Sequence, residues 1–219
     1  MALLLGGLIA GWPGFLGGAT AGGRGEASPP EAGVATAVDV LDLEGRPVRP
    51  LAFGTGAGTG TGTGTAVAGA STETVCVLIF VSNDCPIANR YAPEIRRIAA
   101  RYAKLGVRFW MVHPLADETA ASVREHAKAY DLPGTVVRDP RRELARALGI
   151  TVTPEAAVVD RKGALRYRGR IDDRFPALGQ KRSQATRHDL CEALDAVLAG
   201  KPVPVSRTPA VGCVLAGGV

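Results

Sequence analysis

Residues 74–102 read TVCVLIFVSNDCPIANRYAPEIRRIAARY, and this stretch decides the fold. It opens with an apolar run, Val77–Val81, of the kind that forms a strand buried on both faces. Three polar residues follow, and Cys85 stands directly before Pro86. Because proline lacks an N–H and suits the first position of a helix, Cys85 is expected at or beside the helix N-cap. The stretch therefore predicts a buried strand, a tight turn and a helix that opens at a cysteine.

A thiol at the start of a helix meets unpaired backbone N–H groups and the positive end of the helix dipole. Both stabilise the thiolate relative to the thiol, so we expect Cys85 to be reactive. Its neighbour Asp84 opposes ionisation unless that carboxylate points away or pairs with an arginine.

Length and charge set the limits of the prediction. A chain of 219 residues, 46% hydrophobic, has material for one α/β domain with extra segments. The net charge of +5 is dispersed, without a basic block or interleaved aromatic residues. We therefore expect no nucleic-acid partner.

The N-terminal segment 1–27 is predicted to be a signal peptide or an N-terminal anchor. It is apolar and contains a small-x-small pattern at Ala19–Ala21, but it lacks a positively charged start. Glycines and Pro13 interrupt the apolar run, which favours a cleaved signal over a spanning helix. We expect an exported protein, periplasmic or secreted, with membrane association through this segment as the alternative. Such a compartment permits disulfides.

The remaining boundaries follow from composition. Residues 28–33 are predicted to be a linker, and residues 34–205 the folded domain. Inside the domain, residues 54–65 alternate glycine and threonine and are expected to form a disordered insertion. Residues 206–219 are predicted to be a flexible C-terminal tail that carries Cys213.

Hydrophobic periodicity predicts alternating helices and strands after the cysteine. The first helix has an apolar stripe formed by Ile87, Tyr91, Ile95, Ile98, Tyr102 and Leu105. Further strands are expected at 107–112, 135–139, 155–160 and 165–171, and further helices at 118–130, 141–148 and 187–199. This order predicts an α/β fold with a central mixed β-sheet flanked by helices on both faces.

Three features at fixed distances resemble the thioredoxin superfamily: Pro93 eight residues after Cys85, the pair Thr153-Pro154 before a strand, and Gly169 fifteen residues later. The resemblance implies a thioredoxin-like fold, with Pro154 as a cis-proline packed against the catalytic cysteine. More narrowly, the motifs NDCP, YRGRIDDR and the C-terminal GC resemble exported redoxin-domain proteins of the peroxiredoxin-like (AhpC/TSA) and TlpA-like groups.

The chain also departs from these families. Ala88 stands where thioredoxins carry the second cysteine of C-x-x-C, and Ile79 stands where they carry a buried carboxylate. In the peroxiredoxin motif, Ser82 supplies a hydroxyl, but Leu78 replaces the proline. The chemistry of either family is therefore only partly implied.

Cys85 is predicted to attack a protein disulfide or a peroxide, giving a mixed disulfide or a sulfenic acid. Cys213 is the best candidate for the resolving thiol, and a thiol reductant would complete the cycle. Cys76 and Cys191 are expected to be buried packing residues. Arg170 is expected either to stabilise the thiolate or a leaving oxygen, or to pair with one of the adjacent aspartates 172 and 173.

Two alternatives to an enzyme stay open. The first is a module that binds a thiol partner or copper, although Asn89 replaces the second cysteine of related copper-delivery proteins. His113, His126 and His188 share no ligand spacing, so only a site assembled through space from Cys85, Cys213 and one histidine would serve. The second is a structural Cys85–Cys213 disulfide. Neither a cofactor nor a resident metal is assigned.

Overall fold

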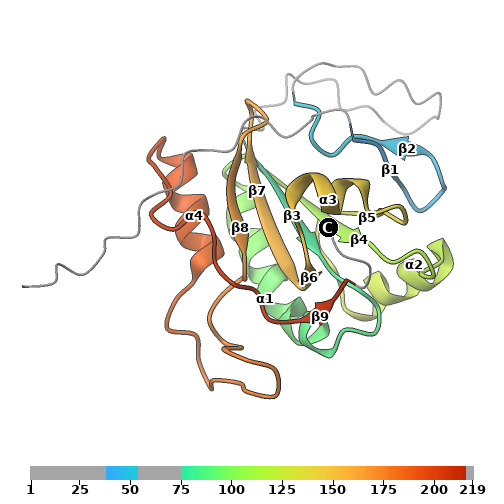
Figure 1. The fold of residues 1–219 in the computed structure, drawn as a ribbon. Coiled ribbons are helices and arrows are strands. Elements are labelled where there is room, and N and C mark those ends of the chain that lie inside the picture. Colours follow the sequence, from blue (N-terminus) through green and yellow to red (C-terminus); the bar gives the residue numbers. More distant parts are fainter. Residues whose placement is uncertain (1–37, 54–74, 216–219) are drawn as a thin grey trace, which may run out of the picture.

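The computed structural model of the protein describes residues 38–53 and 75–215. The expected N-terminal segment 1–27, the linker 28–33 and the insertion 54–65 lie outside the described residues. Within the described residues, seven strands form one sheet in the order β2-β1-β5-β4-β3-β7-β8 (Figure 1). Its strands are β1 (Val40–Leu41), β2 (Pro47–Val48), β3 (Val75–Phe80), β4 (Val107–His113), β5 (Thr135–Arg138), β7 (Glu155–Asp160) and β8 (Leu165–Gly169).

The sheet is mixed, as predicted. Strand β3 lies near its centre, parallel to β4 and antiparallel to β7, and β8 returns antiparallel to β7. All six residues of β3 are buried, because layers cover both of its faces. The apolar run in the sequence is explained by this central position.

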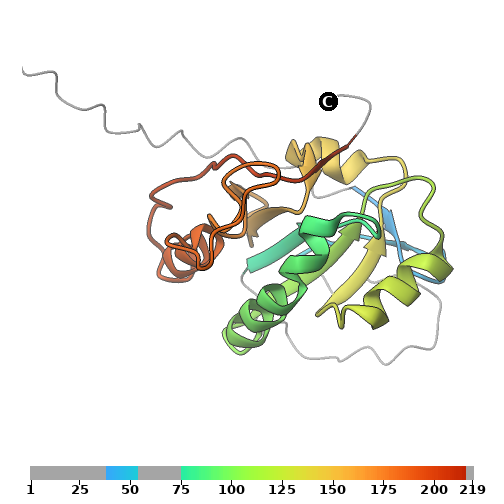
Figure 2. The same cartoon turned by 90° about the horizontal axis from the view of Figure 1, so that it is seen from below.

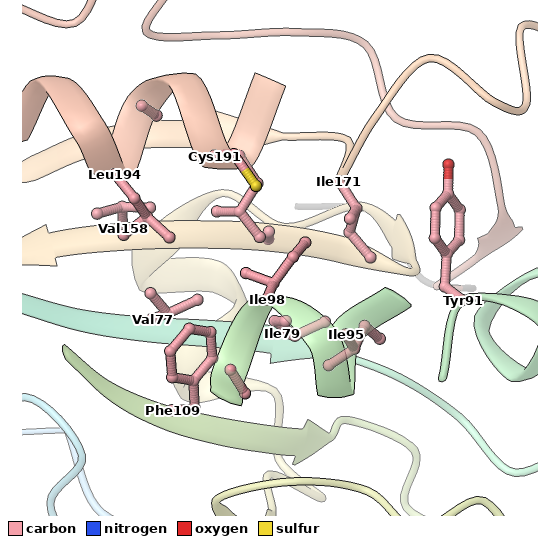
Figure 3. Packing of buried hydrophobic residues seen from close by; sticks show 14 of the residues in the cluster. Val77, Ile79, Tyr91, Ile95, Ile98, Phe109, Val158, Ile171, Cys191 and Leu194 are labelled. Atoms are coloured by element: carbon pink, nitrogen blue, oxygen red, sulfur yellow. The ribbon is translucent and has the colours of Figure 1, made fainter. Parts of the chain in front are cut away.

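Helices cover both faces, which confirms the predicted fold class. They are α1 (Pro86–Ala103), α2 (Ala120–Ala129), α3 (Glu143–Leu148) and α4 (Asp189–Leu198). Side chains of α1 and α4 join one hydrophobic cluster with the sheet, and side chains of α3 join the cluster on the opposite face. Figure 2 shows α1 and α2 on one side of the strands and α3 on the other. Figure 3 shows Ile98 of α1 and Leu194 of α4 in one buried cluster with Val77 and Val158 of the sheet.

Helix α1 begins at Cys85 and Pro86 as predicted and continues through Pro93. Five of the six expected stripe residues are buried, but the prediction for Leu105 is wrong, since that side chain is 56% exposed. The helix ends at Ala103, and Leu105 lies in the turn that follows, where its N–H binds the carbonyl of Tyr102. The helical spacing therefore no longer applies to Leu105.

The chain after Val205 is not a free tail in the described part, 206–215, which corrects that expectation. Ser206 and Thr208 bind the backbone of Arg168 in β8 through hydrogen bonds of 2.9 and 3.1 Å. Farther on, β9 (Cys213–Val214) pairs antiparallel with β6 (Val152–Thr153) in a second, two-stranded sheet. Figure 1 shows the red C-terminal segment crossing the molecule to reach β6.

Gly169 allows this close passage of the C-terminal segment. Its φ is +150°, and a Cβ there would overlap atoms of Thr208. Gly169 is therefore needed because Thr208 of the C-terminal segment packs directly against its backbone.

None of the helices in the described ranges has the length and apolarity needed to cross a bilayer.

Candidate active site: a pair of thiols at Thr153

Cys85 lies between the end of β3 and the first turn of α1. Its side chain is the helix cap and accepts a hydrogen bond from the N–H of Ala88, with an N···S distance of 3.4 Å. Its Sγ also donates to the carbonyl oxygen of Thr153 at 2.9 Å. The residue is 1% exposed. The buried strand and the N-terminal proline thus place the thiol at the helix start, as the sequence predicts.

The Thr153–Pro154 peptide bond is cis, and Thr153 is fully buried beside Cys85. The Thr153 hydroxyl shares a hydrogen bond with the hydroxyl of Ser82, at an Oγ1···Oγ distance of 3.0 Å. Three of the predicted site residues, Ser82, Cys85 and Thr153, are therefore in contact. The serine hydroxyl interacts with the threonine side chain while the sulfur binds the threonine backbone.

Cys213 reaches the same place from the C-terminal segment, because it lies directly opposite Thr153 in the β6–β9 ladder. The approach is close, since a Cβ at Gly212 would overlap the carbonyl of Thr153. Next to it, the Leu215 N–H donates to the carbonyl of Thr151 at 2.9 Å, and the Leu215 side chain is buried. A glycine and an apolar anchor thus hold Cys213 beside Cys85. Both cysteines are free thiols.

The two thiols differ in acidity. Burial opposes ionisation of Cys85, but hydrogen bonds from the Ala88 N–H and from the thiol and N–H of Cys213 outweigh it and lower the pKa of Cys85. Partial desolvation of its sulfur, although the residue is exposed, raises the pKa of Cys213 to about 11, and hydrogen bonding and charge repulsion from Cys85 act in the same direction. Cys85 is therefore the more acidic thiol of the pair, and Cys213 is the less acidic one.

The other two cysteines pack in the interior. Cys76 is fully buried in β3 and its Sγ lies 3.5 Å from the carbonyl oxygen of Pro50. Cys191 is buried on α4, and burial raises the pKa of its thiol. A raised pKa and low exposure make a poor nucleophile.

Arg170 pairs with Asp189 at the start of α4, at 2.7 Å between Nε and Oδ2. The expected pairing with Asp172 or Asp173 is therefore wrong. Asp172 accepts from the Tyr91 hydroxyl at 2.5 Å, and Asp173 binds Arg182 and Thr186. Both aspartates have donors of their own, and Arg170 pairs with Asp189 instead. A role for Arg170 at Cys85 stays a prediction.

A buried polar network supports the turn before Cys85, and sequence reasoning missed it. Glu118 accepts the backbone N–H of Asn83 at 2.5 Å through Oε1. Its Oε2 lies 3.1 Å from Nδ1 of His113, which is fully buried at the end of β4. The Asn83 side chain binds the Ser122 hydroxyl at 3.2 Å. The turn is therefore fixed by Glu118, in the loop between β4 and α2, and by Ser122 of α2.

The network continues into α1. Asn89 donates to the carbonyl of Asn83 at 2.9 Å, and its Oδ1 lies 2.7 Å from Nε2 of His126. The rings of His126 and His113 meet edge to face, with centroids 5.2 Å apart. The sequence held one signal for this network. His113 ends a strand that is parallel to β3, so the C-terminal ends of these two strands, and with them His113 and Asn83, lie at the same edge of the sheet. The position of His126 depends on how α2 packs against α1.

Three other potential metal ligands, Glu94, Asp172 and His188, place their ligand atoms within 4.8 Å of one another. Arg97 binds Glu94 at 2.5 Å, and Arg174 lies 3.3 Å from Asp172. These arginines already balance the carboxylate charges. The group is therefore better described as an ion-pair network, reaching from the buried Asp172 to the exposed His188, than as a cation site.

A thiol at the N-terminus of a helix, beside a cis-proline loop and a mixed sheet, defines a thioredoxin-superfamily protein. The family model described as Redoxin matches residues 53–182, more than half of the sequence. The chain belongs to the redoxin family, a family of thiol oxidoreductases. Cys213 lies outside the matched residues.

Solved structures agree with this fold. The chain is similar to a hypothetical protein from Sinorhizobium meliloti 1021, with 26% identity and a TM-score of 0.65 over 84% of this chain and 95% of the other. An uncharacterised conserved protein from Geobacillus kaustophilus is 24% identical, with a TM-score of 0.64 over 88% of this chain and 91% of the other. No curated protein matches the chain.

Proposed function

We propose that this protein is an exported thiol-dependent oxidoreductase in which Cys85 and Cys213 alternate between two thiols and one disulfide. One observation carries the proposal: both cysteines meet at Thr153, one bonded to its carbonyl and the other paired across from it. In this proposal Cys213 serves as the second thiol, because Ala88 stands where a thioredoxin motif carries its second cysteine. The redoxin family supports thiol chemistry at Cys85.

The proposed reaction starts with attack of the Cys85 thiolate on a disulfide sulfur or a peroxide oxygen. A mixed disulfide or a sulfenic acid forms, and the Cys213 thiol then displaces the substrate thiol or water to give the Cys85–Cys213 disulfide. The pKa of Cys213 is raised partly by the charge on Cys85. Because covalent bonding removes that charge, Cys213 becomes easier to deprotonate when it has to react. A thiol reductant restores the two thiols.

Export is the part of the proposal that rests on residues 1–27, which lie outside the described residues. An oxidising compartment would suit a protein that cycles through a disulfide. Processing of the segment can be tested by expressing the full chain and reading the N-terminal residue of the mature protein.

The activity is tested by running insulin reduction and peroxide consumption side by side on the full chain. We expect Cys85→Ser to abolish whichever activity is present and Cys213→Ser to stop turnover after one event. The matched control is Cys76→Ala, which removes a buried thiol and should keep the activity. Full turnover by Cys213→Ser would contradict the proposed pair.

A structural Cys85–Cys213 disulfide is the alternative, favoured by the pairing of β9 with β6 at the same place. It predicts that reduction lowers the melting temperature markedly while neither assay shows turnover. An oxidoreductase predicts turnover and a reversible disulfide in the same protein.

A further inference from the structure

We propose that reducing thiols enter this site through Cys213: the incoming thiolate bonds to the Cys213 sulfur, and Cys85 leaves as a thiolate. This inference rests on the proposed function, since it requires the Cys85–Cys213 disulfide. It assigns the two cysteines opposite roles in the two halves of the cycle. Cys85 receives the oxidising substrate, and Cys213 receives the reductant.

Accessibility separates the two sulfurs. Cys85 is 1% exposed, and its sulfur contacts the Ala88 N–H and the Thr153 carbonyl. Cys213 is exposed, and the next residue, Val214, is 74% exposed. A thiol from solvent or from another protein therefore meets Cys213 first.

The direction of attack leads to the same result. Exchange at a disulfide needs the thiolate to approach one sulfur along the S–S axis, from the side opposite the leaving sulfur. For attack on Cys85, that approach comes from the interior, where the first turn of α1 and the Thr153 loop lie. For attack on Cys213, the thiolate approaches from the solvent side of β9, whose two residues are both exposed.

The leaving group also favours this course. The rate of exchange rises when the departing thiol is more acidic. Cys85 departs onto the donors at the start of α1, which are already in place. Departure of Cys213 would instead put the thiolate away from the helix start, at a sulfur whose pKa is raised by desolvation even without the charge on Cys85.

The step is balanced. One reductant thiolate adds to Cys213, the Cys85–Cys213 bond breaks, and Cys85 carries the electron pair as a thiolate. A second reductant thiolate then attacks the reductant sulfur of the mixed disulfide, so Cys213 is released and the reductant leaves as its own disulfide. The reductant is a monothiol or a dithiol, and glutathione serves as the probe.

The experiment uses the oxidised full chain. Its intact mass is first compared with that of the reduced protein to establish the disulfide. Excess glutathione is added, the reaction is stopped with acid at short times, and free thiols are alkylated with N-ethylmaleimide in denaturant. Peptide mass mapping then locates both labels. We expect glutathione on the Cys213 peptide and maleimide on the Cys85 peptide, in at least about tenfold excess over the reverse pattern.

The possible results separate the two proposals. If no disulfide is present before glutathione is added, the proposed function fails and this inference fails with it. Glutathione mainly on Cys85, or equally on both cysteines, overturns the inference alone and leaves the disulfide couple standing. Peptides carrying Cys76 and Cys191 serve as internal controls, because buried thiols outside the pair should carry maleimide only.

Discussion

Thr153 is the residue through which both candidate thiols are placed. Its carbonyl oxygen accepts a hydrogen bond from the Cys85 thiol, and its hydroxyl forms a hydrogen bond with the Ser82 hydroxyl. Its backbone pairs with that of Cys213. The acidity of each thiol depends on the other, since Cys213 donates to Cys85 while the Cys85 charge raises the pKa of Cys213. A substitution at either cysteine should therefore move the pKa of the remaining one.

Cys213→Ala should raise the pKa of Cys85, because it removes the thiol donor to the Cys85 sulfur. The ultraviolet absorbance of the thiolate, followed against pH, measures this. Cys85→Ser should correspondingly lower the pKa of Cys213 from about 11. Titrations that are unchanged in both variants would show that the two thiols do not interact.

At the scale of elements, the turn between β3 and α1 is fixed by one side chain from the loop before α2 and by one from α1 itself. Glu118 and Asn89 bind the N–H and the carbonyl of Asn83, two residues before the thiol. The C-terminal strand β9 closes the other side of the site against β6. Each contact suggests a substitution that tests it.

Glu118→Ala should destabilise the protein by about 2–3 kcal/mol, because a charged acceptor is lost while the Asn83 N–H and His113 stay buried. Glu118→Gln keeps one acceptor and should cost less. Urea denaturation of both variants gives the comparison. Equal stability of Glu118→Ala and the unaltered protein would refute a supporting role for this carboxylate.

Gly212→Ala should weaken the β6–β9 pairing, because the added methyl overlaps the carbonyl of Thr153. Formation of the Cys85–Cys213 disulfide should become slower by roughly tenfold. The reason is that weaker β6–β9 pairing brings Cys213 next to Cys85 less often. The rate is measured by trapping free thiols during oxidation. Gly179→Ala is the control. The φ of Gly179 is +75°, and a Cβ there would meet no other atom. This variant therefore shows how much a strained alanine alone slows disulfide formation, without a change at β9.

At the scale of the whole molecule, the packing of α2 against α1 makes stability depend on pH. Burial, aided by repulsion from His113, lowers the pKa of His126 to about 4. The pKa of a histidine in the unfolded chain is about 6.5, so as the pH falls the unfolded state binds this proton before the folded state does. The free energy of unfolding therefore falls as the pH drops from about 6.5 toward about 4.

His126→Gln should remove this contribution while keeping a donor for Asn89. The loss of stability between about pH 7 and about pH 5 should become smaller by about 2 kcal/mol. Urea denaturation at the two pH values checks it. The same pH dependence in both proteins would mean that His126 is not the group responsible.

Local sequence predicted much of the site. The apolar run before Ser82 and the proline after Cys85 indicate a strand and a helix N-terminus through contacts with near neighbours. The family resemblance predicted a cis-proline beside Cys85, and the structure has a cis Thr153–Pro154 bond with the Thr153 carbonyl against the Cys85 sulfur. By contrast, Gly212 suggested a flexible tail, whereas in the folded chain a glycine is needed there because two backbones approach closely.

The sequence by itself determined the mixed sheet, the helix that begins at Cys85 and the absence of a second cysteine at Ala88. Only the tertiary structure decided which distant groups surround that thiol: Cys213 on β9, the Glu118 network behind the turn, and Asp189 as the partner of Arg170. The physical reason is the range of the interactions. Strand and helix starts depend on residues a few positions apart, but the pairing of β9 with β6 and the packing of α2 against α1 depend on the closed fold.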